Sequence, residues 1–321
     1  TGVNPRLEAQ GNITFNLSGI LDYNSTQSSI NINSGKTLTI NFDGSVSFDP
    51  TLGDPSLGVS QGSLIIQAYE NDSFNSSFDN TSWTLSNNLE SLIIGKSSNV
   101  KDITISNDVT ISGPISINGE DITLSNSLVA SGTLLLKGSG AVTQAAAVSA
   151  TMLSLQGSGT FTLNNSNNEV QTLIAGTSTQ TTGNISYTNK DALTIGDGSN
   201  GVLSSGTVSI GTLSGNLTIT EDIETNNTSA SAIKLYADQG EAAGSEGQGN
   251  IIISGTPTLN SGSGGRASLF SGKPASSSGL VNLVGNNNVR IGVDSSTTDF
   301  DPSLNSGAYA LFRTGPEITF T

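Results

Sequence analysis

With 321 residues, no Cys, no His and a formal net charge of −15, this chain excludes several classes of function. A surface this acidic argues against a duplex nucleic-acid partner, since phosphate binding requires basic side chains, and the absence of Cys removes disulfides and thiolate nucleophiles. Without His the chain also lacks the commonest general base and metal ligand, and no apolar run is long enough to span a membrane.

The part of the chain up to Ile66 predicts short strands separated by turns and one loop. Apolar residues alternate with polar ones at 13–15, 30–32, 38–40 and 46–48, which is typical of strands with one buried face. The segment 49–62 holds two Asp-Pro pairs and several glycines, so we expect a loop there. The apolar pattern resumes at 63–66.

Residues 69–83 change character, because four aromatic residues stand among Asn, Asp and Ser without period-two alternation. The favoured interpretation is a loop that folds over its own aromatic rings or covers an exposed end of the fold, since unprotected strand edges invite aggregation. The alternative is a candidate adhesive loop that contacts sugar or protein through Tyr69, Phe74, Phe78 and Trp83.

The stretch from 92 to about 220 carries the clearest pattern. Apolar-polar-apolar triplets occur at 103–105, 109–111, 115–117 and 122–124, so the pattern passes through three triplets before it repeats. The repeat continues from 122 to Val142 and then to Phe161, so successive starts lie 19, 20 and 19 positions apart. A fixed period near twenty with three strands per turn is typical of a β-solenoid. We therefore predict an all-β, single-stranded parallel β-helix with three short strands per coil of about 19–20 residues.

Further triplets at 153–155, 161–163, 193–195, 208–210 and 217–219 continue the coils. Turns between them are rich in Asn and Gly, as at 164–168, where stacked Asn side chains would form ladders between coils.

Residues 221–250 are the best candidate for a helix or a loop, with a strand expected inside them at 233–236 and a loop at 237–250. Shorter strands are expected at 251–253, 267–270, 280–283, 289–291 and 308–312. The domain prediction is one β-helix over 1–313, with loop excursions near 49–62, 69–83 and 237–250. Residues 314–321 would begin a linker or a further β domain, and both ends look cut from a longer protein.

Two catalytic-looking motifs do not fit their usual contexts. Gly58-Val59-Ser60-Gln61-Gly62 matches the G-x-S-x-G nucleophile elbow, but that motif requires a His base, which this chain lacks. The stretch 196–201 matches G-x-G-x-x-G, but a dinucleotide site also needs a helix to begin at the last glycine. Residues 202–204 continue as a strand instead, so this motif predicts a turn of the solenoid.

Paired carboxylates are what a glycosidase without His would use. Three groups stand out, and they are interpreted as solvated or capping side chains: Asp294, Asp299 and Asp301; Glu120 and Asp121; Glu221, Asp222 and Glu224. The sequence thus predicts no enzyme, no catalytic residue and no cofactor. Calcium held by the same oxygen ligands stays open as an alternative, although neither an EF-hand loop nor a nonapeptide calcium repeat occurs.

Two stretches resemble a known family. Residues 138–195 carry Ala-Val-Thr-Gln at 141–144, Leu-x-Leu-x-Gly-x-Gly at 153–159, Asn-Asn-x-Val at 167–170 and Leu-Thr-Ile-Gly at 193–196. They resemble the coil repeats of filamentous-haemagglutinin-type proteins, which are large bacterial β-helical adhesins. Residues 263–313 look like a segment that ends such β-helical stretches. The resemblance implies a right-handed parallel β-helix and an adhesive role, and it supplies no catalytic residues.

These patterns together predict a structural or adhesive rod segment of a large bacterial cell-surface or secreted adhesin, without catalysis. Its expected location is extracellular, and its expected partner is a glycan or protein on a host or neighbouring cell, or a second copy of the chain. Two alternatives stay open: a self-assembling filament subunit, and a β-helix that binds or cleaves polysaccharide.

Overall fold

The structure is a computed structural model that describes the backbone of residues 6–9, 13–17, 22–32, 37–42, 47–52, 62–68, 72–81, 84–85 and 87–316. These residues form parallel β-sheets stacked as a β-solenoid of about 11 turns, with almost no helix. The all-β parallel β-helix expected from the triplet pattern is therefore confirmed. The sequence predicted one continuous β-helix over 1–313, and the chain divides into two compact units, Thr1–Ser154 and Leu155–Thr321.

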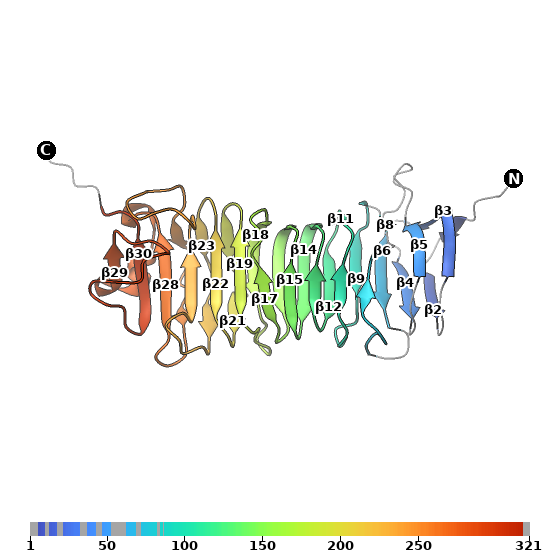
Figure 1. The fold of residues 1–321 in the computed structure, drawn as a ribbon, viewed down its shortest axis with the longest axis horizontal. Coiled ribbons are helices and arrows are strands. Elements are labelled where there is room, and N and C mark those ends of the chain that lie inside the picture. The colour runs from blue at the N-terminus through green and yellow to red at the C-terminus, as the bar shows by residue number, and fades with distance from the viewer. Residues whose placement is uncertain are drawn as a thin grey trace. The chain divides into compact units, whose positions relative to one another are not determined.

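Unit 1 (Thr1–Ser154) contains β1 to β15 and most of β16. Their bounds are β1 (Arg6–Ala9), β2 (Ile13–Leu17), β3 (Asp22–Ile32), β4 (Thr37–Phe42), β5 (Ser47–Leu52), β6 (Ser63–Gln67), β7 (Phe78–Asp79), β8 (Thr84–Leu85), β9 (Ser91–Ile94), β10 (Ile103–Ile105), β11 (Val109–Ile111), β12 (Ile115–Gly119), β13 (Ile122–Leu124), β14 (Leu128–Gly138), β15 (Ala141–Gln144) and β16 (Val148–Gln156). Three sheets run in the orders β1-β3-β5-β8, β2-β4-β6-β9-β12-β14 and β7-β10-β13-β15. Figure 1 shows β9, β12 and β14 side by side, as their parallel pairing requires.

The strand register of unit 1 reproduces the predicted coil. Ile103 lies opposite Ile122, Val109 opposite Leu128, and Ile115 opposite Leu134, so all three strands of this coil advance by the same 19 positions. Coils nearer the start of the chain are longer, since Leu38 pairs with Leu64 and Leu64 with Leu92, which lie 26 and 28 positions apart. The predicted period thus describes the tightest coils and not every coil.

An apolar ladder fills the interior of these coils. In β10 the side chains of Ile103 and Ile105 are fully buried, and Thr104 between them faces outward and is half-buried. Each Ile or Leu that is fully removed from water contributes about 1.5–3 kcal/mol. Because successive coils repeat the same inward positions, stacking extends this core without widening it.

Asp side chains join successive coils of unit 1 at the corners. Asp102 accepts a hydrogen bond from the backbone N–H of Asp121 at 3.3 Å, and Asp121 accepts one from Ala141 at 2.6 Å. Asp108 does the same for the N–H and hydroxyl of Ser127, at 2.9 and 2.7 Å. These hydrogen bonds, the hydroxyl first, hold the pKa of Asp108 below its ordinary value. The corner acids are therefore capping groups, and of the predicted pair Glu120 and Asp121 the second has this role.

Unit 2 (Leu155–Thr321) contains the remaining elements. Their bounds are β17 (Thr160–Leu163), β18 (Glu169–Ala175), β19 (Ile185–Asn189), β20 (Leu193–Ile195), β21 (Val202–Ser204), β22 (Val208–Thr212), β23 (Leu217–Ile219), β24 (Ile223–Thr225), β25 (Ile233–Tyr236), β26 (Ile251–Ile253), β27 (Leu259–Asn260), β28 (Arg266–Ser271), η1 (Pro274–Ser276), α1 (Leu280–Val284), η2 (Asn286–Asn288), β29 (Val289–Ile291) and β30 (Gly307–Phe312). The sheets run β17-β19-β22-β25-β28-β30-β29, β18-β20-β23-β26 and β18-β21-β24-β27.

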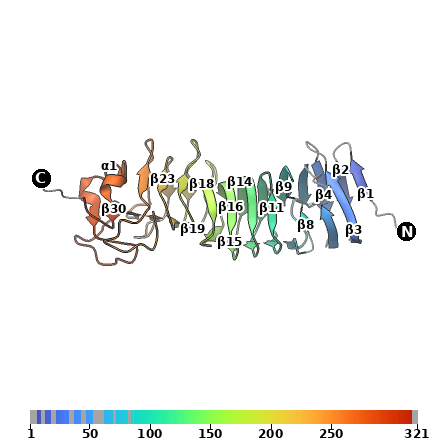
Figure 2. The same cartoon turned by 90° about the horizontal axis from the view of Figure 1, so that it is seen from above.

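One strand expected in unit 2 is wrong. The strand expected at 280–283 is the helix α1, which begins after the left-handed Gly279 (φ 76°) and buries Leu280 and Val284, one turn apart. Figure 2 shows α1 next to β30, against which it packs. The segment 221–250, expected to be a helix or a loop, contains the strands β24 and β25. The strand expected at 233–236 is β25, and the loop expected at 237–250 contains no strand.

Buried Asn side chains in unit 2 bind the backbone, as Asn189 illustrates. It is 1% exposed and accepts hydrogen bonds from the Tyr187 hydroxyl (2.8 Å) and the Val170 N–H (2.9 Å). It donates to the carbonyls of Val170 and Asp191, both at 3.0 Å. Burial raises the pKa of Tyr187. One amide thus satisfies polar groups of two coils that would otherwise be buried without partners.

Among the described residues, no helix has the length and apolar character needed to cross a membrane.

Candidate functional site

An open groove of about 310 Å³ lies on unit 2, over the outward faces of β21 and β24. Leu203 in β21 and Glu224 in β24 are the half-buried outward positions between buried neighbours, and the two residues lie opposite each other in the register. Residues 175–178 form one side of the groove and residues 199–202 the other. The surface therefore arises because strands of successive coils, β18, β21 and β24, pair side by side.

The first wall begins where β18 ends. Gly176 has a φ of 75°, and a Cβ atom there would lie 2.4 Å from the carbonyl oxygen of Leu203, so this position requires glycine. The chain then folds back, and Thr177 and Gln180 exchange backbone hydrogen bonds of 2.8 and 3.2 Å. This small hairpin places Thr177 and Ser178 along the groove.

The second wall is the glycine-rich turn at 196–201. Gly196 and Gly198 adopt positive φ values of 108° and 91°, and Asp197 accepts hydrogen bonds from the N–H groups of Ser199 (2.9 Å) and Asn200 (2.7 Å). Burial works to raise the pKa of Asp197, but these hydrogen bonds outweigh it and lower the pKa. The strand β21 follows the turn, so the G-x-G-x-x-G match is a solenoid turn, as predicted.

Two carboxylate residues, Asp222 and Glu224, line the groove. Asp222 accepts a hydrogen bond from the N–H of Thr258 at 2.7 Å, and Glu224 accepts one from the side-chain amide of Asn260 at 3.0 Å. In each carboxylate this bond involves one oxygen, and the second oxygen makes no hydrogen bond to a described residue. The groove can therefore accept hydrogen bonds through carboxylates whose positions the next coil holds. Of the sequence-predicted group, Glu221 does not line it.

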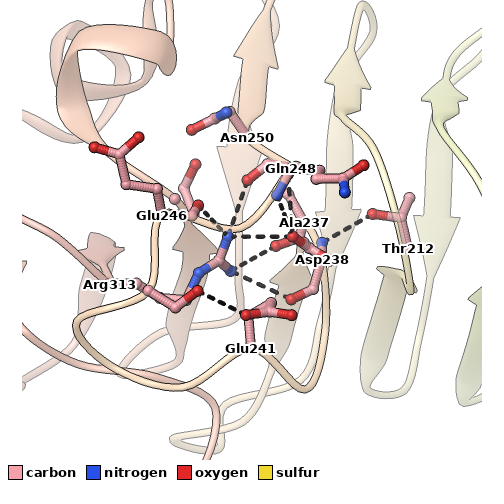
Figure 3. A network of polar contacts seen from close by, with 12 residues as sticks. Thr212, Ala237, Asp238, Glu241, Glu246, Gln248, Asn250 and Arg313 are labelled. Atoms are coloured by element: carbon pink, nitrogen blue, oxygen red, sulfur yellow. Dashed lines mark hydrogen bonds and ion pairs between the residues drawn. The ribbon is translucent and has the colours of Figure 1, made fainter.

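A second polar cluster in unit 2 surrounds Arg313, which is 2% exposed (Figure 3). Its guanidinium donates to the carbonyls of Ala237 (2.8 Å) and Asp238 (3.3 Å) through one nitrogen, and to those of Glu246 (3.2 Å) and Gly249 (3.1 Å) through the other. The Asp238 carboxylate lies 3.8 Å from the second nitrogen. Burial lowers the pKa of Arg313, and the nearby acidic charges oppose that shift.

Asp238 connects this cluster to a neighbouring strand. Its N–H donates to the Thr212 hydroxyl at 3.0 Å, and its carboxylate accepts hydrogen bonds from the N–H groups of Gln248 and Gly249 at 2.5 and 3.2 Å. Among the described residues other than glycine, Asp238 alone has a positive φ, at 63°. Since its polar groups point into the protein, the Arg313 cluster fixes the 237–250 stretch and is structural.

Two of the four aromatic residues of the candidate adhesive loop lie among the described residues. Tyr69 and Trp83 lie outside the described residues. Phe74 and Phe78 are 2% and 5% exposed, and their rings stack with centroids 5.8 Å apart. Phe78 belongs to β7 and lies opposite Ile103, so it continues the interior ladder. The coil therefore buries both of these rings, and the adhesive role of the loop stays a prediction.

In the acidic group formed by Asp294, Asp299 and Asp301, Asp294 binds backbone and side-chain groups of neighbouring loops. Asp294 accepts hydrogen bonds from the Ser296 hydroxyl (2.6 Å) and from the N–H groups of Ser296 (2.9 Å) and Ala243 (2.8 Å). These bonds, the hydroxyl first, lower the pKa of Asp294 to about 2. Asp299 and Asp301 are exposed. Within the described ranges, no group of three or more acidic residues is placed to hold a metal ion.

Sequence reasoning missed several residues of both clusters. The groove residues Thr177, Ser178 and Ser199 carry no motif of their own, although the glycines at 196–201 signalled one wall. Arg313 could have been noticed as a basic residue directly after an apolar strand, but the carbonyls that it binds lie 64 to 76 positions earlier in the sequence.

Searches against protein-family models, curated proteins and solved structures found no match to this chain. The resemblance to filamentous-haemagglutinin-type proteins therefore gains support from the β-helical fold alone.

Proposed function

We propose that this chain is a structural and adhesive segment of a large bacterial adhesin that acts outside the cell or at its surface. The observation that carries the proposal is the repeated coil, with Ile, Leu and Val inward and Ser, Thr and Asn outward. The sequence resemblance at 138–195 and 263–313 supports the same role. Attachment of this kind requires no catalysis by the chain.

Physical reasoning connects the coil to the role. Interior strands pair with neighbours on both sides, as β12 does with β9 and β14, so their backbone groups are satisfied along the stack. Coils of this kind contact only their neighbours, which lets a chain present a long polar surface with a narrow core. Such a surface suits attachment, because its outward side chains and corner loops can vary while the core stays constant.

An attachment assay tests the proposal. Beads coated with the protein are incubated with cultured epithelial cells and with bacterial cells, and attached beads are counted against beads coated with albumin. A variant with Ile195→Asp puts a charge on a fully buried position of β20, and we expect it to lose attachment with its fold. The matched control Thr218→Asp adds the same charge at a half-buried outward position of β23 and should attach normally. Attachment no greater than that of albumin on both cell types would contradict the proposal.

Sedimentation velocity separates this role from the filament alternative. We expect a single species whose sedimentation coefficient is independent of concentration up to about 100 μM, a range in which weak self-association becomes visible. Growth of larger species with concentration would favour a self-assembling subunit instead.

A further inference from the structure

The groove on unit 2 combines donors and acceptors at one surface. Thr177, Ser178 and Ser199 carry hydroxyls that can both donate and accept, whereas the carboxylates of Asp222 and Glu224 accept. The Thr177 hydroxyl also lies 3.4 Å from that of Thr179. A ligand that satisfies all of these groups must itself donate and accept at several atoms. The hydroxyl groups of a sugar have this property. With about 310 Å³, the groove lies at the small end of the range for ligand sites.

The acceptors of the groove are held in place before any ligand arrives. One oxygen of Asp222 is bonded to the N–H of Thr258, and one oxygen of Glu224 is bonded to Asn260, both in the next coil. The second oxygen of each carboxylate makes no hydrogen bond within the described part of the chain. Binding therefore loses little side-chain freedom at these two positions, which favours affinity for a small polar ligand.

The charge of the groove selects against anions. Its lining contains Asp222 and Glu224 but no Lys or Arg, and like charges at close range oppose binding. The backbone N–H groups of Ser199 and Asn200, which could have bound a phosphate, already donate to Asp197. An amine would satisfy the carboxylates but would leave the hydroxyl donors of Ser178 and Ser199 without acceptors.

One apolar side chain completes the surface. Leu203, at the half-buried outward position of β21, lines the groove beside the polar groups, whereas Ala175 and Val202 are buried beneath it. One face of a pyranose ring exposes C–H groups, which can pack on Leu203 while the ring hydroxyls reach the polar walls. Placing apolar surface beside a few fixed polar groups is the usual composition of a small-ligand site.

We propose that the groove binds a neutral saccharide unit. The second oxygens of Asp222 and Glu224 accept hydrogen bonds from sugar hydroxyls, and the hydroxyls at 177, 178 and 199 bind the remaining sugar hydroxyls and the ring oxygen. The proposal rests on the adhesive function above and names the class of ligand that one surface of this chain recognises.

A glycan array with matched variants tests the groove. The array carries lactose, N-acetyllactosamine, maltotriose and mannotriose as neutral probes, sialyllactose as an anionic probe and a glucosamine trimer as a cationic probe. The best neutral probe is then titrated by calorimetry against the variants Glu224→Gln, Asp222→Asn and Ser199→Trp. We expect each variant to bind at least about ten-fold more weakly, since hydrogen bonds to charged groups are lost or the groove is filled. The control Glu169→Gln changes an exposed carboxylate of β18 outside the groove and should bind within about two-fold of the unchanged protein.

Each outcome decides a separate point. Circular dichroism establishes that the variants are folded, and Ser178→Trp fills the opposite wall if Ser199→Trp does not fold. Equal binding by all the groove variants, or tighter binding of sialyllactose or the glucosamine trimer, overturns the proposal. If no neutral probe binds while coated beads still attach to cells, the groove assignment is wrong and the adhesive function stands. Binding of a neutral probe through the groove without bead attachment would support the groove and contradict the adhesive function.

Discussion

Replacing Arg313 with Met removes a buried cation while keeping a side chain of similar length. The guanidinium donates to four carbonyls, at distances from 2.8 to 3.3 Å, and all four belong to residues 237–249. Each buried carbonyl that loses its donor costs about 1–3 kcal/mol, because it stays desolvated and unpaired. We therefore expect Arg313→Met to lower the unfolding free energy of unit 2 by at least about 3 kcal/mol.

The distances around Arg313 distinguish the contribution of the carbonyls from that of the Asp238 carboxylate. The distance from Arg313 to the carboxylate of Asp238 is 3.8 Å, which is too long for a hydrogen bond. Most of the stabilisation should therefore come from the carbonyl contacts. A double-mutant cycle with Asp238→Asn measures the pair itself, and we expect a coupling energy of about 0.5–1 kcal/mol, at the low end for residues in contact.

Urea unfolding followed by circular dichroism measures the free energy, and hydrogen exchange of peptides covering 237–250 locates the change. The matched control is Lys190→Met, which removes a half-exposed cation that lies 3.6 Å from Asp191. Exposed pairs contribute about 0–1 kcal/mol, so this variant should unfold nearly as the unchanged protein does. If Arg313→Met shifts the transition no further than Lys190→Met, the reasoning about the carbonyl contacts is refuted.

Three further predictions concern single side chains. Asn189→Ala should lower the unfolding free energy by at least about 2 kcal/mol in urea titrations, because it leaves buried polar groups unpaired, whereas Asn164→Ala at an exposed turn should have a smaller effect. The pKa of Asp294, lowered to about 2 from 3.8, means that its carboxylate stabilises the fold above about pH 4 and loses this effect as the pH falls towards 2. Hydrogen exchange at Ala243, corrected for the intrinsic rate, should therefore increase as the pH falls from about 4 to about 2. No increase would contradict a role for the hydrogen bond from the Ala243 N–H to Asp294. Phe78→Ala should cost unit 1 about 3–5 kcal/mol without loss of bead attachment at temperatures where the variant is folded. Lost attachment by the folded variant would show that the ring contacts a partner.

The coil register was predictable because it depends on side chains that recur at fixed spacing. The triplets from 103 to 124 identify the inward positions, and the pairing of Ile103 with Ile122 follows from their period. The strand β14 was less visible, because Ser131 and Gly132 interrupt its apolar pattern. The structure shows why the strand continues through them: its first part pairs with β11 and its second part with β12, so the two residues lie between two pairing partners of the same sheet.

Short apolar segments were ambiguous for a physical reason. In Leu280–Val284, the apolar residues occupy positions that fit one turn of helix and also fit a short buried strand. The flanking glycines decide the outcome, since Gly279 takes a left-handed conformation and a Cβ atom there would lie 2.9 Å from Ile253. Contacts of this kind depend on residues brought near only by the fold, which also explains why neither the groove nor the Arg313 cluster was predicted.

The lengths of the coils indicate where specificity resides. In the tightest coils of unit 1, paired residues are 19 or 20 positions apart, whereas in unit 2 Ile233 pairs with Ala267 and Ala267 with Ala308, 34 and 41 positions apart. The paired strands stay in register, as Ile233 opposite Ala267 shows, so the added residues lie in the segments that connect one paired strand to the next. Lengthening a surface loop costs little free energy, because the entropy of closing a loop grows only with the logarithm of its length. The groove wall that follows β18 and the 237–250 stretch are additions of this kind. We therefore expect binding differences between β-helical chains of similar core to reside in such segments, and the apolar ladder to determine only that the coils stack.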